Sequence, residues 1–349
     1  MQQSTYLIGE IGQNHNGSVE IAKLIIDVAA RPVIDPLFNH ELKGMDGIKL
    51  TKRDLDYELS ASALKMPYNS PHSFGKTYGE HRKALELSEE QHLEIYKYAK
   101  GKALDVIETL CAVPCLSLLK YFTPDKLKVA SRDLTNPPLL EALAETKIPM
   151  IISTGMAGKK ELDQALGLIT KYHDQISILH CVSEYPTNPE NVNLNSILYL
   201  KKHYSDFAIG YSDHTIGIST PVAAVAMGAT IIEKHLTIDR KMKGTDQAGS
   251  LGIEGVQRMV RDIRLLELSL GKTEIFMEPA VAEGQIKLER SIAVRMDLKA
   301  GEFIAENDLH LLSPGDGFKW TERDEILGKK LKKDIGKNEI IYPDFLQEL

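Results

Sequence analysis

Short apolar runs of strand length alternate along the chain with longer segments in which hydrophobic residues recur at helical spacing. The apolar runs predict eight strands, at Tyr6–Ile11, Gly47–Leu50, Leu104–Thr109, Leu127–Ala130, Met150–Ser153, Ile176–Cys181, Phe207–Gly210 and Thr230–His235. The segments between them predict helices at Val19–Ala30, Glu89–Lys100, Leu116–Tyr121, Leu139–Thr146, Lys159–Tyr172, Asn195–His203, Thr220–Met227 and Ile253–Leu270. This alternation predicts an α/β fold whose strands close into a (β/α)8 barrel.

The structural alternative is a doubly wound open sheet that binds a dinucleotide. Such a sheet carries a G-x-G-x-x-G turn directly after its first strand, where the backbone must approach a pyrophosphate. Residues 9–17 read GEIGQNHNG and lack that spacing. The barrel, of the TIM type, is therefore the preferred prediction.

Two long connections and the C-terminal part depart from the regular alternation. Residues 31–46 and 52–88 exceed ordinary barrel connections, and long loops on the active-site face commonly shape a pocket. Near the C-terminus the pattern changes to short strand-like runs, at Ser291–Val294, Glu302–Ile304, Leu309–Leu312 and Glu339–Ile341. We therefore expect a catalytic barrel over residues 1–272, a linker over 273–289 and a small β-rich domain over 290–349.

Composition and charge narrow the class of protein. The formal charge of −7 argues against general nucleic-acid binding, and no apolar run reaches the roughly 18 residues of a membrane span. The first residues, MQQSTYLIGE, lack the basic and apolar regions of a signal peptide, so a cytoplasmic location is expected. The three cysteines do not indicate a disulfide framework or a zinc site.

Two histidines stand at the ends of the last two predicted strands. His214 lies in AIGYSDHTIG and His235 in ATIIEKHLTID. The C-terminal ends of barrel strands converge on the active-site face, so two imidazoles there could bind one metal ion. Two unrelated loop histidines would give the same pattern, and on this pair alone the two interpretations weigh equally.

Several strand-end motifs together resemble one family. GEIGQNHNG, KVASRDLTN, STGM, HCVSEYPT, YSDHT and EKHLT occur in that order, and MDLKAGEFIAENDLHLLSPGDG follows them. The first six are similar to the sialic acid synthase family, which includes the N-acetylneuraminate, legionaminate and pseudaminate synthases and spore-coat polysaccharide relatives. The last is similar to the antifreeze-like (SAF) domain of those enzymes. The resemblance covers nearly the whole chain.

The resemblance implies an activity, a cofactor and an assembly. Family members condense phosphoenolpyruvate with an open-chain aldose, giving phosphate and a sialic-acid-like nonulosonic acid for surface polysaccharides. They use a divalent metal, commonly Mn²⁺, with Mg²⁺ or Co²⁺ as alternatives. They are typically domain-swapped homodimers in which the tail domain caps the partner's barrel. No nucleic acid or membrane partner is implied.

The same resemblance assigns roles to individual residues. It implies that His214 and His235 hold the metal, and that Glu10 acts in proton transfer or stabilises charge beside them. It implies a phosphoenolpyruvate site made by Lys49, Thr109, Lys128, Ser131, Ser153, Ser183, Tyr185 and Ser212. It implies that Asp133 and Asp246 face the acceptor sugar. Taken singly, a strand-end lysine is usually a solvated charge and these serines are ordinary turn residues.

The acceptor side departs from the family pattern. Arg132 stands where a small residue is usual, and Ser313-Pro314-Gly315 replaces Arg-Pro-Gly. We therefore hypothesise an acceptor other than standard N-acetylmannosamine, with Arg132 contacting an added anionic or hydroxyl group. The alternative is that Arg132 points to solvent and that Lys319 substitutes for the missing arginine.

Two other functions remain open at this point. One is a carbon–carbon-bond-forming barrel that uses a Schiff-base lysine, which would resist chelators and be trapped by borohydride. The other is a catalytically silent sugar-binding protein, which would bind ligand without releasing phosphate. The joint presence of two histidines, Glu10 and two lysines favours the metal-dependent enzyme.

Overall fold

The computed structural model describes residues 4–35 and 39–347 and divides into two compact units, Met1–Gly271 and Lys272–Leu349. In the first unit parallel strands close into a barrel in the order β1-β10-β9-β8-β7-β6-β5-β4, which confirms the predicted (β/α)8 fold. The barrel strands are β1 (Tyr6–Gly12), β4 (Gly47–Lys52), β5 (Asp105–Leu110), β6 (Lys126–Val129), β7 (Met150–Ser153), β8 (Ile176–Cys181), β9 (Ala208–Asp213) and β10 (Ile231–His235).

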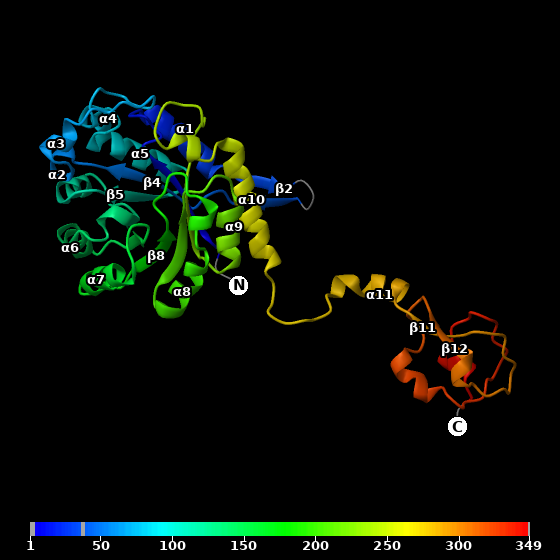
Figure 1. Ribbon diagram of the computed structural model, residues 1–349. Helices are drawn as coiled ribbons and strands as arrows, with labels where there is room; N and C mark the ends of the chain where they lie inside the picture. The colour runs from blue at the N-terminus through cyan, green and yellow to red at the C-terminus, as the bar shows by residue number, and fades with distance from the viewer. Residues whose placement is uncertain (1–3, 36–38, 348–349) are drawn as a thin grey trace. The chain divides into compact units, whose positions relative to one another are not determined.

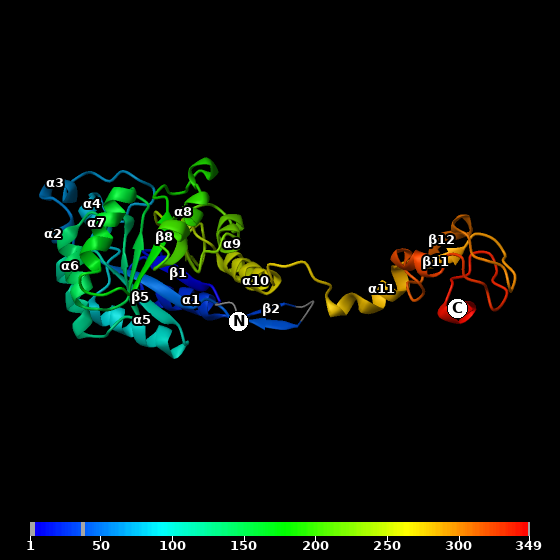
Figure 2. The same ribbon diagram turned by 90° about the horizontal axis from the view of Figure 1, so that it is seen from below.

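Helices surround these strands on the outside, as Figures 1 and 2 show. The α-helices of the barrel ring are α1 (Val19–Ala30), α5 (Glu89–Gly101), α6 (Pro137–Glu145), α7 (Lys159–Ile169), α8 (Asn195–His203), α9 (Ser219–Ala226) and α10 (Ile253–Ser269). Short 3₁₀ helices are η1 (Val113–Lys120), η2 (Ser131–Asp133), η3 (Pro189–Asn191) and η4 (Gln247–Gly249). Polar caps fix several helix starts: the Ser18 side chain accepts from Ile21 N at α1, and Ser88 forms a capping box with Gln91 at α5.

The barrel has two apolar layers. The larger fills the space between strands and helices, where leucine and isoleucine side chains from both are buried. The smaller lies inside the barrel and consists of Ile8, Ile107, Ile151, Leu179 and Ile231, with Tyr6 packed against them. Because these residues plug the barrel interior, polar residues farther along the same strands are left at its C-terminal end.

The long connections contain secondary structure of their own. The hairpin β2 (Val33–Asp35) and β3 (His40–Leu42) lies within the predicted loop 31–46, of which residues 36–38 lie outside the described part. The segment 52–88 contains α2 (Leu55–Glu58), α3 (Ala61–Leu64) and α4 (Tyr78–Lys83). Both segments are thus more ordered than their composition indicates.

The second unit has its own small apolar core, which includes Ile292, Val294, Ile326 and Ile341. Two predicted strands are observed as the antiparallel pair β11 (Ser291–Val294) and β12 (Leu309–Leu312), whereas the other two runs contribute only isolated bridges through Phe303 and Ile340. The helical elements are η5 (Pro279–Val281), α11 (Ala282–Leu288), η6 (Glu306–Asp308), η7 (Trp320–Glu325) and η8 (Pro343–Phe345). Part of the predicted linker 273–289 is therefore helical.

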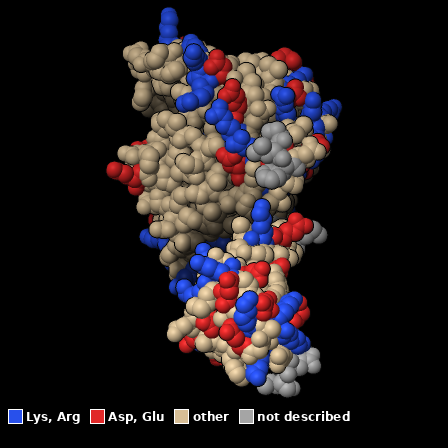
Figure 3. All heavy atoms as spheres, turned by 90° about the vertical axis from the view of Figure 1, so that its right-hand side faces the viewer, with Lys and Arg blue, Asp and Glu red and all other residues tan. Residues whose placement is uncertain are grey.

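The surface carries both signs of charge. On the face shown in Figure 3, lysines and arginines are interleaved with acidic side chains, and neither sign forms a continuous field. Among the helices of residues 4–35 and 39–347, none combines the length and apolarity required to cross a membrane. All three cysteines are buried and free.

Candidate active site

A cavity of about 520 Å³ opens at the C-terminal ends of the barrel strands. Strand register places key residues side by side there: Glu10 of β1 pairs with His235 of β10 on one side and with Lys49 of β4 on the other. Thr109 of β5 likewise pairs with Lys128 of β6. The predicted site residues that line this cavity are Glu10, Lys49, Thr109, Lys128, Ser131, Arg132, Ser153, Ser183, Tyr185, Ser212, His214, His235 and Asp246.

The two histidines lie side by side at the ends of neighbouring strands. Strand β9 continues to Asp213, beyond the predicted end at Gly210, so His214 follows it directly, and His235 is the last residue of β10. Their ring centroids lie 5.5 Å apart, and the Tyr185 ring packs 4.0 Å from that of His214. His214 Nδ1–H donates to the carbonyl oxygen of Val182 over 2.8 Å, which fixes the tautomer and leaves the Nε2 lone pair available.

The donor set fits a divalent metal. His235 Nδ1 is buried and has no hydrogen-bond partner in the described part of the chain, and burial lowers the pKa of His235 and so favours the neutral imidazole that a metal requires. Within residues 4–35 and 39–347 there is no cluster of three or more His, Cys, Asp or Glu side chains suited to a metal ion. Two imidazoles would therefore leave the other coordination positions to water or substrate oxygens.

A buried charge cluster lies beside the histidines. Lys49 Nζ is 2.8 Å from Glu10 Oε2 and 3.7 Å from Glu233 Oε1, and Ser212 Oγ donates to Glu233 Oε1 over 3.1 Å. Burial raises the pKa of Glu10 to about 7, although Lys49 opposes that shift. Burial also acts to raise the pKa of Glu233, but Lys128 and Lys49 outweigh it and lower that pKa to about 2. Glu10 is thus the carboxyl group suited to exchange a proton near neutral pH.

Hydroxyl groups line the wall of the cavity opposite the buried charge cluster. Gly155 N–H donates to Ser131 Oγ over 3.0 Å, and Ser153 Oγ is buried without a partner in the part of the chain that the structure describes. A Cβ at residue 155 would overlap Ser183 Oγ and come within 2.7 Å of Ser131 Oγ. Only glycine leaves this space open, and the ring of donors with Lys49 and Lys128 suits an anionic ligand.

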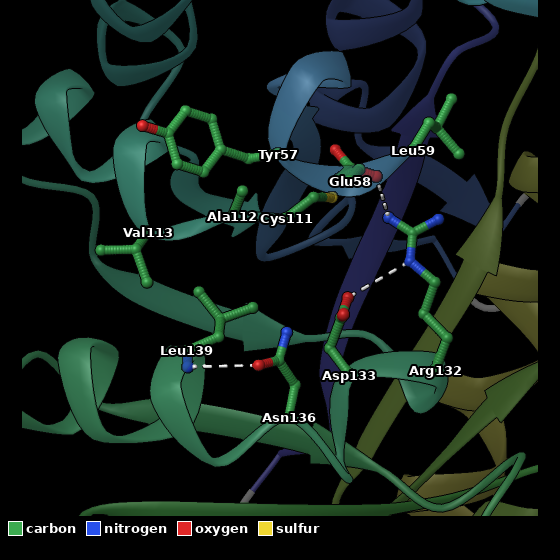
Figure 4. Close-up of a pocket in the computed structure, with 10 residues that line it drawn as sticks. All are labelled: Tyr57, Glu58, Leu59, Cys111, Ala112, Val113, Arg132, Asp133, Asn136 and Leu139. Carbon is green, nitrogen blue, oxygen red and sulfur yellow. Dashed lines mark hydrogen bonds and ion pairs between the residues drawn. The ribbon is translucent and has the colours of Figure 1, made fainter. Parts of the chain in front are cut away.

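One predicted sugar-side residue lies apart from the others. Asp133 lines a second, adjoining pocket of about 360 Å³, whereas Asp246 lies in the main cavity. Arg132 lines both spaces, and its guanidinium is paired with Asp133 and with Glu58, as Figure 4 shows. The Arg132 side chain is 37% exposed, so its guanidinium reaches solvent while it is paired with the two carboxylates.

Several cavity residues were not predicted from the sequence. Glu233 shares the inward face of β10 with His235, and the two-residue period of that strand could have identified it. Arg53, Glu58 and Arg82 come from the irregular segment 52–88, in which no pattern indicates which side chains point inward.

A buried ion pair joins the two strands that carry the histidines. Lys234, next to His235, and Asp213, next to His214, are partners in the register of β9 and β10. Lys234 Nζ lies 2.5 Å from Asp213 Oδ2, and both side chains are almost completely buried. The pair therefore joins the two strands at the point where each presents its histidine.

Two family models and several known proteins match the chain. Residues 40–275 match the NeuB family, and residues 289–347 match the SAF domain. The chain is 32% identical to N-acetylneuraminate-9-phosphate synthase of Homo sapiens, over 99% of this chain and 93% of that protein. It is 34% identical to N,N'-diacetyllegionaminic acid synthase of Legionella pneumophila, over 95% of this chain and 91% of that one. The crystal structure of N-acetylneuraminic acid (sialic acid) synthetase from Leptospira borgpetersenii, in complex with citrate, is similar with a TM-score of 0.65 at 32% identity, over 81% of this chain and 90% of that chain.

Proposed function

The chain belongs to the NeuB family, and from that premise we propose that it condenses phosphoenolpyruvate with an open-chain aldose. It is an enzyme of the sialic acid synthase type. The proposed products are a nonulosonic acid and inorganic phosphate, and the proposed cofactor is a divalent metal ion, Mn²⁺ first, with Mg²⁺ or Co²⁺ as alternatives. Relatives whose names specify sialic and legionaminic acid synthesis support the reaction.

One observation carries the proposal: two buried lysines, Glu10 and two histidines meet in one cavity. Phosphoenolpyruvate has a phosphate and a carboxylate, and Lys49 and Lys128 supply two positive charges that water screens little at these depths. The hydroxyl groups of Ser131, Ser153 and Ser183, which line the cavity, provide further donors to its oxygens. An acidic protein can thus hold a strongly anionic substrate locally.

The residues divide the chemistry among them. Carbon–carbon bond formation joins the vinyl carbon of phosphoenolpyruvate to the aldehyde carbon, water adds at the phosphate-bearing carbon, and phosphate leaves. His214 and His235 would hold the metal, which when bound supplies Lewis-acid polarisation of the aldehyde. Glu10, with its pKa near 7, would accept the proton that the attacking water loses and return it to the former aldehyde oxygen, which becomes a hydroxyl group. The second proton of that water leaves with phosphate as the keto group forms. The apolar side chains inside the barrel close the cavity from below.

A Schiff-base mechanism is the second candidate, and Lys128 is the observation that favours it. Burial lowers the pKa of Lys128, and the described structure gives its ammonium group one hydrogen bond, to the carbonyl of Val129. Borohydride treatment in the presence of an aldose distinguishes the two mechanisms. Covalent trapping at Lys128 would support the second candidate and contradict the first.

The test of the proposed function is phosphate release from phosphoenolpyruvate over a panel of aldoses. We expect release with Mn²⁺, none after EDTA treatment, and a loss of at least a hundredfold in His214→Ala. His203→Ala is the matched control, because His203 is an exposed histidine at the end of α8. Undiminished activity of His214→Ala, or activity resistant to EDTA, would refute the metal assignment.

Assembly and location form a separate part of the proposal. We propose a cytoplasmic homodimer in which the SAF domain of one chain caps the barrel of the other. This proposal is supported by the presence of both a NeuB family segment and a SAF domain in one chain. Light scattering on the full chain should give twice the mass of 38.9 kDa, and a monomeric mass with full activity would contradict the dimer.

A further inference from the structure

The barrel closes where its first strand, β1, pairs with its last strand, β10, and the loops that follow these two strands are joined by side-chain amides. Loop 13–18 lies between β1 and α1, and loop 236–252 lies between β10 and α10. Both loops border the main cavity, because Gln13 lines it from the first loop and Thr245 and Asp246 line it from the second. The contacts between the loops therefore bear on the shape of the active site.

Three amide side chains make these contacts. Asn14 Nδ2 donates to the carbonyl oxygen of Leu236 over 2.8 Å, and Asn16 Nδ2 donates to that of Lys243 over 2.9 Å. In the other direction, Gln247 Nε2 donates to the carbonyl oxygen of Asn14 over 3.1 Å. The amide clasp, as we call Asn14, Asn16 and Gln247, thus joins the two loops through hydrogen bonds that run both ways.

Gln247 is the most enclosed member of the amide clasp, with an exposed fraction of 0%. Its Oε1 accepts from Thr237 Oγ1, and its Nε2 lies 3.4 Å from Asn16 Oδ1 as well as donating to Asn14. Gly244 packs against this contact at a φ of +149°, and a Cβ there would lie 2.9 Å from Gln247 Cγ and 3.3 Å from Asn16 Oδ1. The Gln247 amide is therefore both satisfied and tightly surrounded.

The part of the second loop that reaches the cavity has no apolar anchor. Among residues 239–250 only Gly244, Gln247 and Ser250 are buried, and none of them has an apolar side chain. Burial of apolar side chains is the usual source of stability for a folded segment. Because this segment lacks such burial, its position depends on hydrogen bonds, and the fully buried Gln247 amide makes the central ones.

This loop forms a wall beside the two histidines. Asp246, His214 and His235 all line a pocket of about 80 Å³ on that side of the cavity. Ser250 Oγ donates to the carbonyl oxygen of Asp246 over 2.6 Å and accepts from Asn14 Nδ2 over 2.8 Å. The amide clasp is therefore connected to Asp246 on both sides, through its chain neighbour Gln247 and through Ser250.

We propose that Gln247 and Asn14 are positioning residues, which hold Asp246 in place beside the histidines across the closure between β1 and β10. Neither residue lines the main cavity, so each acts on the reaction through Asp246 and not by contact with a substrate. This inference rests on the proposed function, because it takes an aldose to meet Asp246 in the cavity.

The kinetic test is Gln247→Leu, which removes every hydrogen bond of the amide and nearly preserves the side-chain volume. With Mn²⁺, we expect the KM for an accepted aldose to rise at least tenfold. The KM for phosphoenolpyruvate should change less than twofold, because Lys49 and Lys128 lie on β4 and β6. Loss of stability alone would lower kcat with the folded fraction and leave both KM values unchanged, and that pattern would overturn the proposal.

A control variant and a double variant separate positioning from stability. Tyr6→Phe is the matched control, because Tyr6 Oη donates to Asp105 Oδ2 over 2.6 Å at the opposite end of β1 from the cavity. It should keep both KM values. If Gln247 acts through Asp246, Asp246→Ala/Gln247→Leu should have the same KM for the aldose as Asp246→Ala, within twofold. A further tenfold rise in the double variant would overturn the proposal.

Limited digestion with trypsin tests the amide clasp without any substrate, since Lys241 and Lys243 are exposed in the loop. We expect cleavage at these lysines, identified by mass spectrometry, to be at least tenfold faster in Gln247→Leu than in the wild type or Tyr6→Phe. Gly244→Ala, whose Cβ would press on Gln247, should show the same increase and replaces Gln247→Leu if that variant does not fold. Unchanged cleavage in both variants would overturn the proposal. Phosphate release by the wild type with none of many aldoses would instead overturn the proposed function, and digestion would still decide whether the amide clasp holds the loop.

Discussion

Replacing Lys234 by methionine tests whether the buried ion pair behind the histidines holds the site together. Lys234 and Asp213 are 1% and 0% exposed at their side chains, and Lys234 Nζ also donates to the carbonyl of Thr215. Asp213 further accepts from Tyr211 Oη over 2.8 Å and from Thr215 N over 2.9 Å. Lys234→Met leaves this carboxylate buried without its cation.

The magnitude follows from what remains around Asp213. Removing one partner of a buried pair typically costs about 3–5 kcal/mol. The hydrogen bonds from Tyr211 and Thr215 persist, so we expect the lower end, about 3 kcal/mol, within a total free energy of unfolding of roughly 5–15 kcal/mol. The double variant Lys234→Met/Asp213→Asn removes both charges and should recover most of that loss.

Urea unfolding monitored by circular dichroism measures the free energy, and calorimetric titration with Mn²⁺ measures the consequence for the site. Because each member of the pair is the chain neighbour of one histidine, we expect Lys234→Met to weaken Mn²⁺ binding about tenfold. A loss of unfolding free energy below about 1 kcal/mol, together with unchanged Mn²⁺ affinity, would refute the reasoning.

Three further predictions concern the cavity itself. Lys128→Met should raise the KM for phosphoenolpyruvate about 10–100-fold in steady-state kinetics, because it removes a charge-assisted hydrogen bond of about 1.5–3 kcal/mol. The control is Lys126→Met, at the other end of the same strand, which should leave this KM unchanged. The pKa of Glu10 rises from 4.5 to about 7 on folding, so its stabilising contribution is complete below pH 4.5 and is lost as the pH rises through 7. As the pH rises from 5 to 8, the free energy of unfolding of Glu10→Gln should therefore rise relative to that of the wild type by up to about 3 kcal/mol, measured by urea unfolding. The same pH dependence of that free energy in both proteins would contradict the burial argument. Gly155→Ala should lower kcat/KM for phosphoenolpyruvate at least tenfold, because its Cβ would overlap Ser183 Oγ, and wild-type kinetics would show that this space is not used.

The barrel and the strand-end residues could be predicted because both follow from local patterns. A polar residue that ends a strand-length apolar run is expected at the C-terminal end of the barrel. This rule was sufficient to predict that Glu10, Lys49 and His235 lie close together. The same rule applied to alternate residues of β10 would also have found Glu233.

The second pocket, which adjoins the main cavity at Arg132, could not be predicted in this way. Arg132 and Glu58 are far apart in the sequence, and their ion pair depends on how the irregular segment 52–88 folds over the strand ends. Neither propensity nor periodicity encodes that tertiary contact, so the sequence indicated an unusual Arg132 but not its two carboxylate partners. The difference matters chemically, because Glu58 and Asp133 offset part of the positive charge that an isolated Arg132 would present to the acceptor.

The central claim, metal-dependent condensation at the paired histidines, is tested most directly by adding Mn²⁺ back to metal-stripped full-length protein. Phosphate and nonulosonic acid are quantified together at each step, with phosphoenolpyruvate and an accepted aldose in excess. The account predicts no product without metal, equal amounts of acid and phosphate, and activity that saturates at one Mn²⁺ per chain in the wild type but not in His235→Ala. Full activity of the stripped protein, or of His235→Ala, would contradict it.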